Sequence, residues 1–93
     1  MSSWTGRGAA TRVHSPDFDT DFLVLPQKIQ RQIEKKLDEM GLRLGDHPHY
    51  RLTGSPECRF RVGDYRVIYD FDVEKNVIYL LALGSRDKIY KRW

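Results

Sequence analysis

The spacing of the apolar residues changes once along this 93-residue chain, near residue 57. Before that point, the clearest pattern is a set of apolar side chains three or four residues apart: Ile29, Ile33, Leu37 and Met40. This period places them on one stripe of an amphipathic helix. Gly41 follows, and glycine favours a helix C-terminus. The pattern therefore predicts a helix over residues 26–40 that is capped by Gly41.

A strand and a shorter helix are expected before this segment. Residues 10–14 fit a short first strand, and Ser15 then offers a side chain that can cap a helix. Pro16 is favoured at the first helical position, and acidic residues follow it near the positive end of the helix dipole. This helix should end near Leu25 and Pro26. Residues 1–9 are small and polar, and we interpret them as a flexible leader.

From Cys58 onward the apolar period becomes two, which is typical of strands. Apolar and basic side chains alternate along residues 58–62, and Gly63-Asp64 is a hairpin turn signal. Residues 65–71 make the returning strand. Residues 77–83 are apolar on both faces, as in a central or covered strand that Gly84 ends. The remaining segments are a loop over residues 41–57 and a basic, aromatic tail of one or two helical turns over 86–93.

These elements predict the α+β class, with a small antiparallel sheet packed against two N-terminal helices in the order β-α-α-β-β-β. A helical pair that covers one face of the sheet leaves the other face free. If Cys58, Phe60 and Val62 point toward the helices, Arg59 and Arg61 must point away from them. We expect a single domain over residues 1–93.

Composition narrows the class of protein. Hydrophobic residues make up 40% and charged residues 31%, as in an ordinary globular domain. The single cysteine, Cys58, excludes an internal disulfide framework and a Cys-rich zinc site. The chain has neither an apolar run of the roughly 20 residues that span a bilayer nor a signal peptide, so we expect a cytoplasmic protein.

The net charge of +3 is unevenly distributed. Residues 1–46 carry seven basic and seven acidic side chains, whereas residues 47–93 carry nine basic and six acidic ones. The whole excess therefore lies in the second half. Modest net charge with local clustering fits a focused anion site.

A row of arginines is the strongest functional signal. Arg59 and Arg61 share one face of a strand, and Arg66 lies just across the predicted hairpin. Like charges opposite each other destabilise a sheet, so such a row suggests an anionic partner. Guanidinium groups bind phosphate through a planar fork of donors, and with Arg86 the row suits an RNA phosphodiester. The alternative is a solvated face balanced by neighbouring acids.

Two further positions have open interpretations. Tyr90 lies four residues beyond Arg86, where a phenol could stack on a base or orient a phosphate, or instead pack on the sheet edge. His47 and His49 lie two apart in the loop, but a metal site would need a third ligand from elsewhere in the fold. We therefore expect no metal and no cofactor.

Three motifs carry a resemblance to a known family. They are L-T-G-S-P-E-C-R-F-R-V (52–62), G-D-Y-R-V-I-Y (63–69) and A-L-G-S-R-D-K-I-Y (82–90). Over these roughly 40 residues the chain resembles RelE-like toxins of the RelE/ParE toxin–antitoxin superfamily. The resemblance implies a small sheet packed on two helices and an endoribonuclease that cleaves mRNA in the ribosomal A site. In that family the 2′-hydroxyl attacks the adjacent phosphate, without a metal, and leaves a 2′,3′-cyclic phosphate and a 5′-hydroxyl.

The resemblance also implies the roles of individual residues. The catalytic positions are Arg61, Arg66, Arg86 and Tyr90. The RNA-binding positions are Arg59, Arg61, Lys88 and Lys91. The best-known members have lysines where this chain has Arg59 and Arg61, and many have a histidine where Ser85 stands. Arginine stabilises a phosphorane but is a poor general base, so the proton acceptor is left open among Tyr90, His47, His49 and the ribosome.

Two other functions fit a chain of this kind. The ParE-like branch shares the fold but inhibits DNA gyrase without nuclease chemistry, and it would need none of the arginine row. A non-catalytic RNA- or protein-binding module is the third possibility. A toxin of either branch implies a cognate, RelB-like antitoxin, which we expect to be acidic and partly disordered. The nuclease would in addition bind the ribosome and mRNA.

Overall fold

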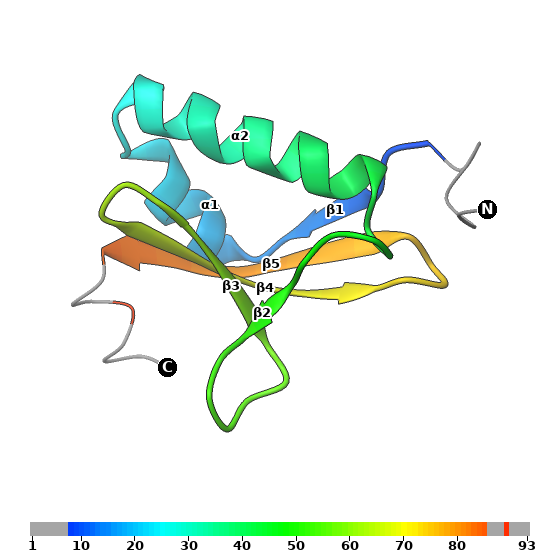
Figure 1. Cartoon of the computed structure of the whole chain (residues 1–93). Helices are drawn as coiled ribbons and strands as arrows, with labels where there is room; N and C mark the ends of the chain where they lie inside the picture. Colours follow the sequence, from blue (N-terminus) through cyan, green and yellow to red (C-terminus); the bar gives the residue numbers. More distant parts are fainter. Residues whose placement is uncertain (1–7, 86–88, 90–93) are drawn as a thin grey trace.

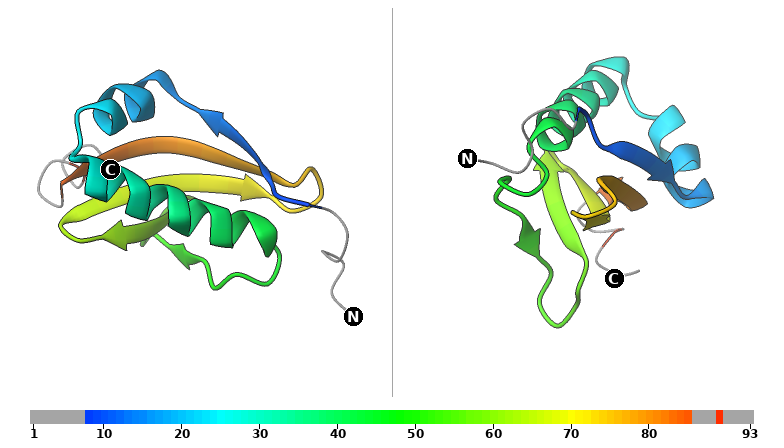
Figure 2. Two further views of the ribbon diagram at one scale, coloured as in Figure 1. Left: turned by 90° about the horizontal axis from the view of Figure 1, so that it is seen from above. Right: turned by 90° about the vertical axis from the view of Figure 1, so that its right-hand side faces the viewer.

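A computed structural model of the chain describes residues 8–85 and Ile89. Two helices pack on one side of a five-stranded sheet (Figure 1). Figure 2 shows α2 lying across that sheet when it is seen from above. The elements are β1 (Thr11–His14), α1 (Pro16–Leu23), α2 (Gln27–Leu42), β2 (Tyr50–Arg51), β3 (Cys58–Val62), β4 (Tyr65–Asp72) and β5 (Val77–Ser85). The α+β class and the helix pair are thus confirmed.

The sheet is mixed, with the strand order β1-β5-β4-β3-β2. β3, β4 and β5 form the expected antiparallel meander, but β1 pairs with β5 in parallel. The prediction of a wholly antiparallel sheet was therefore wrong in this one pairing. Parallel neighbours need a long crossover, and here the helices and three strands lie between the two partners. No local sequence pattern predicts a pairing between segments so far apart.

The beginning of α1 follows the sequence prediction. Ser15 is the N-cap, and its Oγ accepts a hydrogen bond from the Phe18 N–H at 3.1 Å. The end of α2 does not follow it, because the helix continues to Leu42 and its C-cap is Arg43. Gly41 lies buried in the last turn, where its carbonyl accepts a hydrogen bond from the Ala10 N–H at 3.0 Å. It allows the chain before β1 to approach closely and does not end the helix.

Two strand boundaries also differ from the expectation. The segment 41–57, predicted as a loop, contains β2, whose residues Tyr50 and Arg51 pair with Arg59 and Cys58. β5 continues through Gly84 to Ser85, so Gly84 does not end it. The hairpin between β3 and β4 is as predicted. Gly63 adopts a φ of 58° in its turn, a conformation that glycine takes at little cost.

The main core lies between the helices and the sheet. Cys58, Phe60 and Val62 of β3 belong to the same buried cluster as Ile33 and Leu37 of α2, as the alternation predicted. The opposite face of the sheet was expected to be free, and this was only partly right. A second buried cluster covers part of that face and consists of Ile68, Ala82 and Ile89, with Leu52 and Leu81 packed against it. Across residues 8–85, neither helix has the length and apolar character to span a bilayer.

Candidate nucleic-acid interface

Three of the predicted arginines come together on the face of the sheet opposite the helices. Along β3, Arg59 is half-buried and Arg61 is exposed, while Cys58, Phe60 and Val62, which alternate with them, are buried in the main core. Across the hairpin, Arg61 is directly paired with Arg66 of β4. Residues paired in this way project from the same face of the sheet. The structure therefore places Arg59, Arg61 and Arg66 as one group, which we call the arginine row.

The members of the arginine row differ in burial. Arg66 keeps only 6% of its surface exposed, whereas Arg61 projects into solvent. On its other side Arg66 is paired with Gly84 of β5, and a side chain at Gly84 would meet Ile89 at 3.7 Å. Ile89 therefore lies close to Gly84, beside Arg66. Arg66 is therefore buried, whereas Arg61 extends into solvent, where a partner can reach it.

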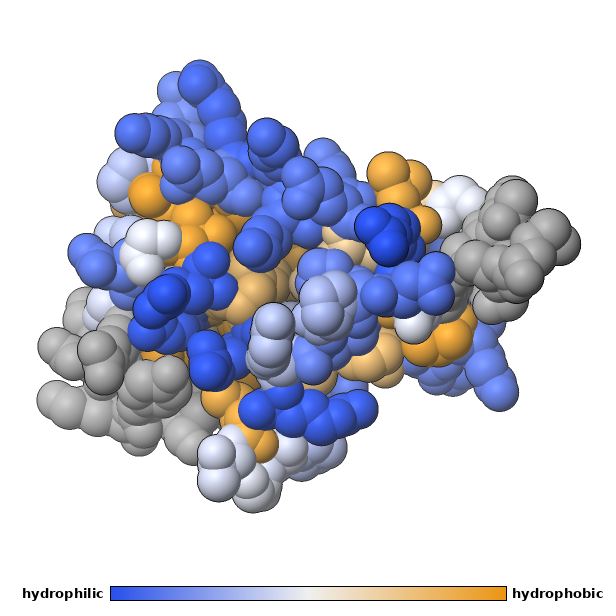
Figure 3. Space-filling view, viewed as in Figure 1, coloured by the Kyte–Doolittle hydropathy of each residue, from blue (hydrophilic) through white to orange (hydrophobic). Residues whose placement is uncertain are grey.

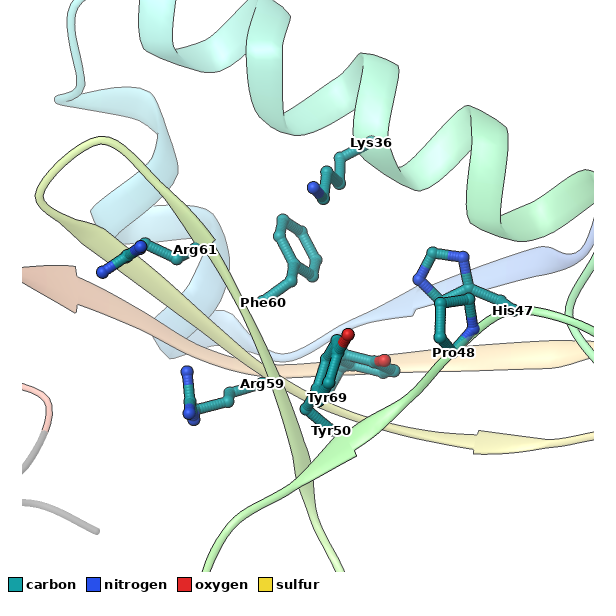
Figure 4. A pocket seen from close by; sticks show the side chains of 8 residues that line it. All are labelled: Lys36, His47, Pro48, Tyr50, Arg59, Phe60, Arg61 and Tyr69. Carbon is teal, nitrogen blue, oxygen red and sulfur yellow. The ribbon is translucent and has the colours of Figure 1, made fainter.

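A pocket of about 500 Å³ opens at the edge of β3, between α2 and the loop that leads into β2. It is lined by residues from α2, that loop, β2, β3 and β4: Lys36, His47, Pro48, Tyr50, Arg59, Phe60, Arg61 and Tyr69. In Figure 4, the side chains of Arg59 and Arg61 lie on one side of the pocket, and His47 and Pro48 lie on the other. Figure 3 shows hydrophobic residues exposed between hydrophilic ones on this face of the molecule.

Sequence reasoning had found the arginines of this pocket but not Lys36, Tyr50 or Tyr69. Lys36 projects from a helix whose exposed face looked like an ordinary charged surface. Tyr50 lies on the unpredicted strand β2, directly opposite Arg59. Its place beside the arginine row depends on a two-residue pairing, and the only local hint was an aromatic residue next to two histidines.

Both ring nitrogens and the ring face of His49 contact neighbouring residues. Its Nε2 lies 2.8 Å from the carbonyl oxygen of Leu44, and its Nδ1 lies 2.6 Å from the hydroxyl oxygen of Tyr69. A carbonyl only accepts, so Nε2 carries the proton and Nδ1 accepts the Tyr69 O–H. The ring also stacks on Phe71 with centroids 3.8 Å apart. Both nitrogens of His49 are therefore occupied, which leaves neither for a substrate.

Burial sets the protonation states of this pair. It lowers the pKa of His49, an effect that the hydrogen bond to Leu44 partly opposes and the charge of Arg51 reinforces. Burial also raises the pKa of the Tyr69 hydroxyl well above its ordinary value. Both groups are consequently neutral at physiological pH, which suits a hydrogen bond from the Tyr69 hydroxyl to a neutral imidazole.

His47 differs from His49 because its ring lines the pocket. The two imidazole rings are 5.0 Å apart. Burial lowers the pKa of His47, and the positive charges of Lys36, Arg43 and, when it is protonated, His49 lower it further. His47 is therefore a neutral imidazole beside a cationic surface. Among residues 8–85 and 89, the structure gathers no group of three or more metal-ligating side chains.

The other predicted site residues fall outside the part of the chain that the structure describes. They are Arg86, Lys88, Tyr90 and Lys91. The expected helical turns over residues 86–93 are outside it as well, so these assignments stay predictions. Ile89 is described and is buried against Ile68 and Ala82. Position 89 thus lies on the same face of the sheet as the arginine row.

Known structures share this fold. The chain is similar to the isolated Escherichia coli RelE toxin, with a TM-score of 0.71, 18% identity and coverage of 90% of this chain and 94% of that chain. The intact E. coli RelBE toxin–antitoxin complex gives a TM-score of 0.68 and 22% identity over 83% and 96% of the two chains. The archaeal RelE–RelB complex from Pyrococcus horikoshii OT3 gives 0.66 and 24% over 84% and 96%. The fold is thus that of RelE-like toxins.

The family assignment comes from the sequence itself. Residues 13–90 match the family described as the ParE toxin of the type II toxin–antitoxin system parDE. The chain therefore belongs to the ParE toxin family of type II toxin–antitoxin systems. The membership in the RelE/ParE superfamily that the three motifs predicted is confirmed. No curated protein matches the sequence.

Proposed function

We propose that this toxin is an endoribonuclease that cleaves mRNA in the ribosomal A site and thereby inhibits translation. The observation that carries the proposal is the direct pairing of Arg61 with Arg66, with Arg59 on the same face. Two guanidinium groups on paired strand positions concentrate positive charge on this face of the sheet. A phosphodiester is a complementary anion, and its oxygens match the fork of donors that arginine presents.

The proposed reaction is a transesterification within the RNA strand. The 2′-oxygen forms a bond to the adjacent phosphorus, and the bond from that phosphorus to the 5′-oxygen breaks. The 2′-hydroxyl gives up a proton and the leaving 5′-oxygen takes one, so the products are a 2′,3′-cyclic phosphate and a 5′-hydroxyl. Arg61 and Arg66 would stabilise the charge of the pentacoordinate phosphorane, and Arg59 would bind the RNA backbone. No metal or other cofactor takes part.

The remaining assignments rest on the sequence motifs. Arg86 and Tyr90 would complete the catalytic group, and Lys88 and Lys91 would contact RNA. His49 is a poor candidate for the proton acceptor, because both of its ring nitrogens are hydrogen-bonded, one to Leu44 and the other to Tyr69. Tyr90, His47 and a ribosomal group remain. Catalysis would then depend chiefly on charge stabilisation and on holding the 2′-hydroxyl in line with the leaving oxygen.

The partners of the proposed nuclease are the ribosome with its mRNA, and a cognate, RelB-like antitoxin. Family membership and the described RelBE and RelE–RelB complexes support an antitoxin partner. An acidic and partly disordered antitoxin would complement the basic arginine row and associate rapidly with it. A ribosome-dependent nuclease would act in the cytoplasm.

Toeprinting of a defined mRNA on purified ribosomes tests the nuclease function, with free RNA as a control. We expect cleavage only on the ribosome. Arg61→Ala and Arg86→Ala should each abolish most of it while the variant still folds and binds the antitoxin. Lys75→Ala is the matched control, because Lys75 is an exposed cation in the turn after β4, whereas Arg66 lies at the start of that strand. Full cleavage by both arginine variants would contradict the proposal.

Inhibition of DNA gyrase is the second candidate, and the match to the ParE toxin family is what favours it. A gyrase supercoiling assay with the same purified protein distinguishes the two functions. Intact mRNA together with lost supercoiling would assign the toxin to the gyrase-inhibiting branch. Cleaved mRNA with normal supercoiling would support the nuclease.

A further inference from the structure

The pocket beside β3 has two ends with different chemistry. Arg59 and Arg61 form a cationic end, and Figure 4 shows their side chains extending away from His47, with Lys36 of α2 between the two ends. His47, Pro48 and Tyr50 supply the rings of the other part, which we call the ring end. Its volume of about 500 Å³ is within the range of small-molecule sites. A ligand that fills the pocket would therefore carry negative charge at one end and a flat, uncharged group at the other.

Tyr50 is the most exposed part of the ring end. It keeps 65% of its surface in solvent, so core packing does not explain an aromatic residue at this position. Because it is paired with Arg59 across β2 and β3, its ring and the Arg59 guanidinium occupy neighbouring positions on the same face. An exposed ring next to a cation is the usual arrangement for binding one nucleotide of a single strand, with the base on the ring and the phosphate on the cation.

The segment that carries His47 is held in place on both sides. The His47 N–H donates to the Arg43 carbonyl oxygen at 2.8 Å, and Pro48 restricts the backbone that follows. His49 is then fixed by Leu44 and Tyr69. His47 therefore projects from a rigid loop. Burial and the charges of His49, Lys36 and Arg43 lower its pKa against the opposing effect of Glu39, so it offers one donor and one acceptor nitrogen at neutral pH.

We propose that the ring end binds one unpaired nucleobase of the RNA whose phosphates contact the arginine row. Tyr50 stacks on this base, and His47 contacts its edge, so these two residues influence which sequence is cleaved. The proposal rests on the proposed nuclease function. With His47 on the base and the attacked phosphate at the cationic end, the proton acceptor would be Tyr90 or a ribosomal group instead of His47. An unpaired base is required, since bases within a duplex are stacked and their faces are inaccessible.

Binding of short oligonucleotides to the full-length toxin tests the proposal. The two probes are a 2′-O-methyl trinucleotide, which cannot be cleaved because its 2′-oxygens are blocked, and an abasic trimer with the same number of phosphates. The wild type should prefer the base-containing probe about tenfold, which is typical for stacking one base. Tyr50→Ala and His47→Ala should reduce this preference without changing affinity for the abasic probe. Tyr50→Phe should retain it.

Controls separate this proposal from the nuclease function. Arg59→Ala should weaken binding of both probes, and His14→Ala, which alters an exposed histidine on β1, should change neither. If Tyr50→Ala weakens both probes equally or affects neither, the base site is overturned, while ribosomal cleavage can still be intact. If the wild type binds neither probe and cleaves no mRNA, both proposals fail. If Tyr50→Ala and His47→Ala impair only antitoxin binding, the pocket serves a protein and the base site is overturned.

Discussion

Arg61 of β3 lies directly opposite Arg66 of β4, so two guanidinium side chains project from neighbouring positions on one face of the sheet. Their environments differ, because Arg66 is 6% exposed and Arg61 is in solvent. Like charges at directly opposite positions destabilise a sheet. The pairing also concentrates positive charge on this face, which suits the binding of a phosphate.

Arg61→Ala should reduce ribosomal cleavage without reducing the stability of the protein. Removing the exposed guanidinium relieves its repulsion with Arg66, so the free energy of unfolding should stay constant or rise by up to about 1 kcal/mol. Ribosomal cleavage should fall by about 100-fold or more, as when one group that stabilises a transition-state charge is lost. Urea denaturation and toeprinting of the same preparation measure both effects.

Lys75→Ala is the control for this comparison, because it removes an exposed cation from the β4–β5 turn without touching the arginine row. It should change neither quantity. Arg61→Lys should recover part of the activity, since lysine keeps the charge but lacks the planar fork of donors. A loss of stability in Arg61→Ala, with unchanged cleavage, would mean that Arg61 has a structural role.

Short sequence patterns were sufficient to predict the start of α1 and the strand β3. Ser15-Pro16 defined the start of α1, and the alternation of Cys58, Phe60 and Val62 with arginines gave both the strand and its buried face. The arginine row followed from these, because residues two apart share a face and Gly63 fixes the hairpin. This part of the site therefore needed only strand geometry.

The features that the sequence did not show depend on contacts between distant segments. The parallel β1–β5 pairing joins Thr11 to Val77, and the end of α2 depends on the approach of Ala10 to Gly41. The ring end of the pocket needs β2 to place Tyr50 opposite Arg59. A two-residue strand is too short to show a period, so Tyr50 could not be assigned to a face before the pairing was known.

Tyr69→Phe should destabilise the protein by removing a hydrogen bond that holds the segment carrying His47. It removes the hydroxyl that donates to His49 Nδ1 at 2.6 Å and leaves a partly buried acceptor without its partner. We expect the free energy of unfolding to fall by about 1–2 kcal/mol, the usual effect of such a loss. Urea denaturation measures it. Tyr79→Phe on β5 is the matched control and should have less effect. Equal stability of Tyr69→Phe and the wild type would contradict a structural role for this hydrogen bond.

Acidification should destabilise the protein between about pH 7 and pH 5. Burial lowers the pKa values of His47 and His49 below their ordinary value of 6.5. In this range the unfolded chain binds more protons than the folded protein, so the free energy of unfolding decreases as pH falls through 6.5. The decrease ends below the folded-state pKa values, where both states are protonated.

Urea denaturation at several pH values measures this dependence. His47→Gln should reduce the slope while the hydrogen bonds of His49 remain. His49→Gln should reduce it as well and also lower stability at pH 8, because Leu44 and Tyr69 lose their partner. A wild-type protein that becomes more stable between pH 7 and pH 5.5 would have the opposite sign from that expected for two partly buried, neutral histidines.

Ser15 connects α1 to an irregularity in β5. Ile68 pairs with Ala82 and Tyr69 pairs with Leu80, so Leu81 is an extra residue, as in a β-bulge. The Ser15 N–H donates to the Leu80 carbonyl at 2.9 Å, and its hydroxyl donates to the Leu81 carbonyl at 2.8 Å. The same Oγ caps α1 through the Phe18 N–H. One side chain thus holds the helix start against the sheet.

Ser15→Ala should therefore cost about 1–2 kcal/mol of unfolding free energy, at the upper end for loss of a helix cap because the Leu81 carbonyl also loses its donor. Ser15→Thr keeps both functions of the hydroxyl and should retain most of the stability. Ser15→Asp keeps an acceptor for the cap but has no proton for Leu81, so it should recover only part. Thr20→Ala, an exposed change in α1, controls for helix propensity. If Ser15→Asp and Ser15→Thr are equally stable, the hydrogen bond to the bulge contributes nothing and the cap alone accounts for the effect.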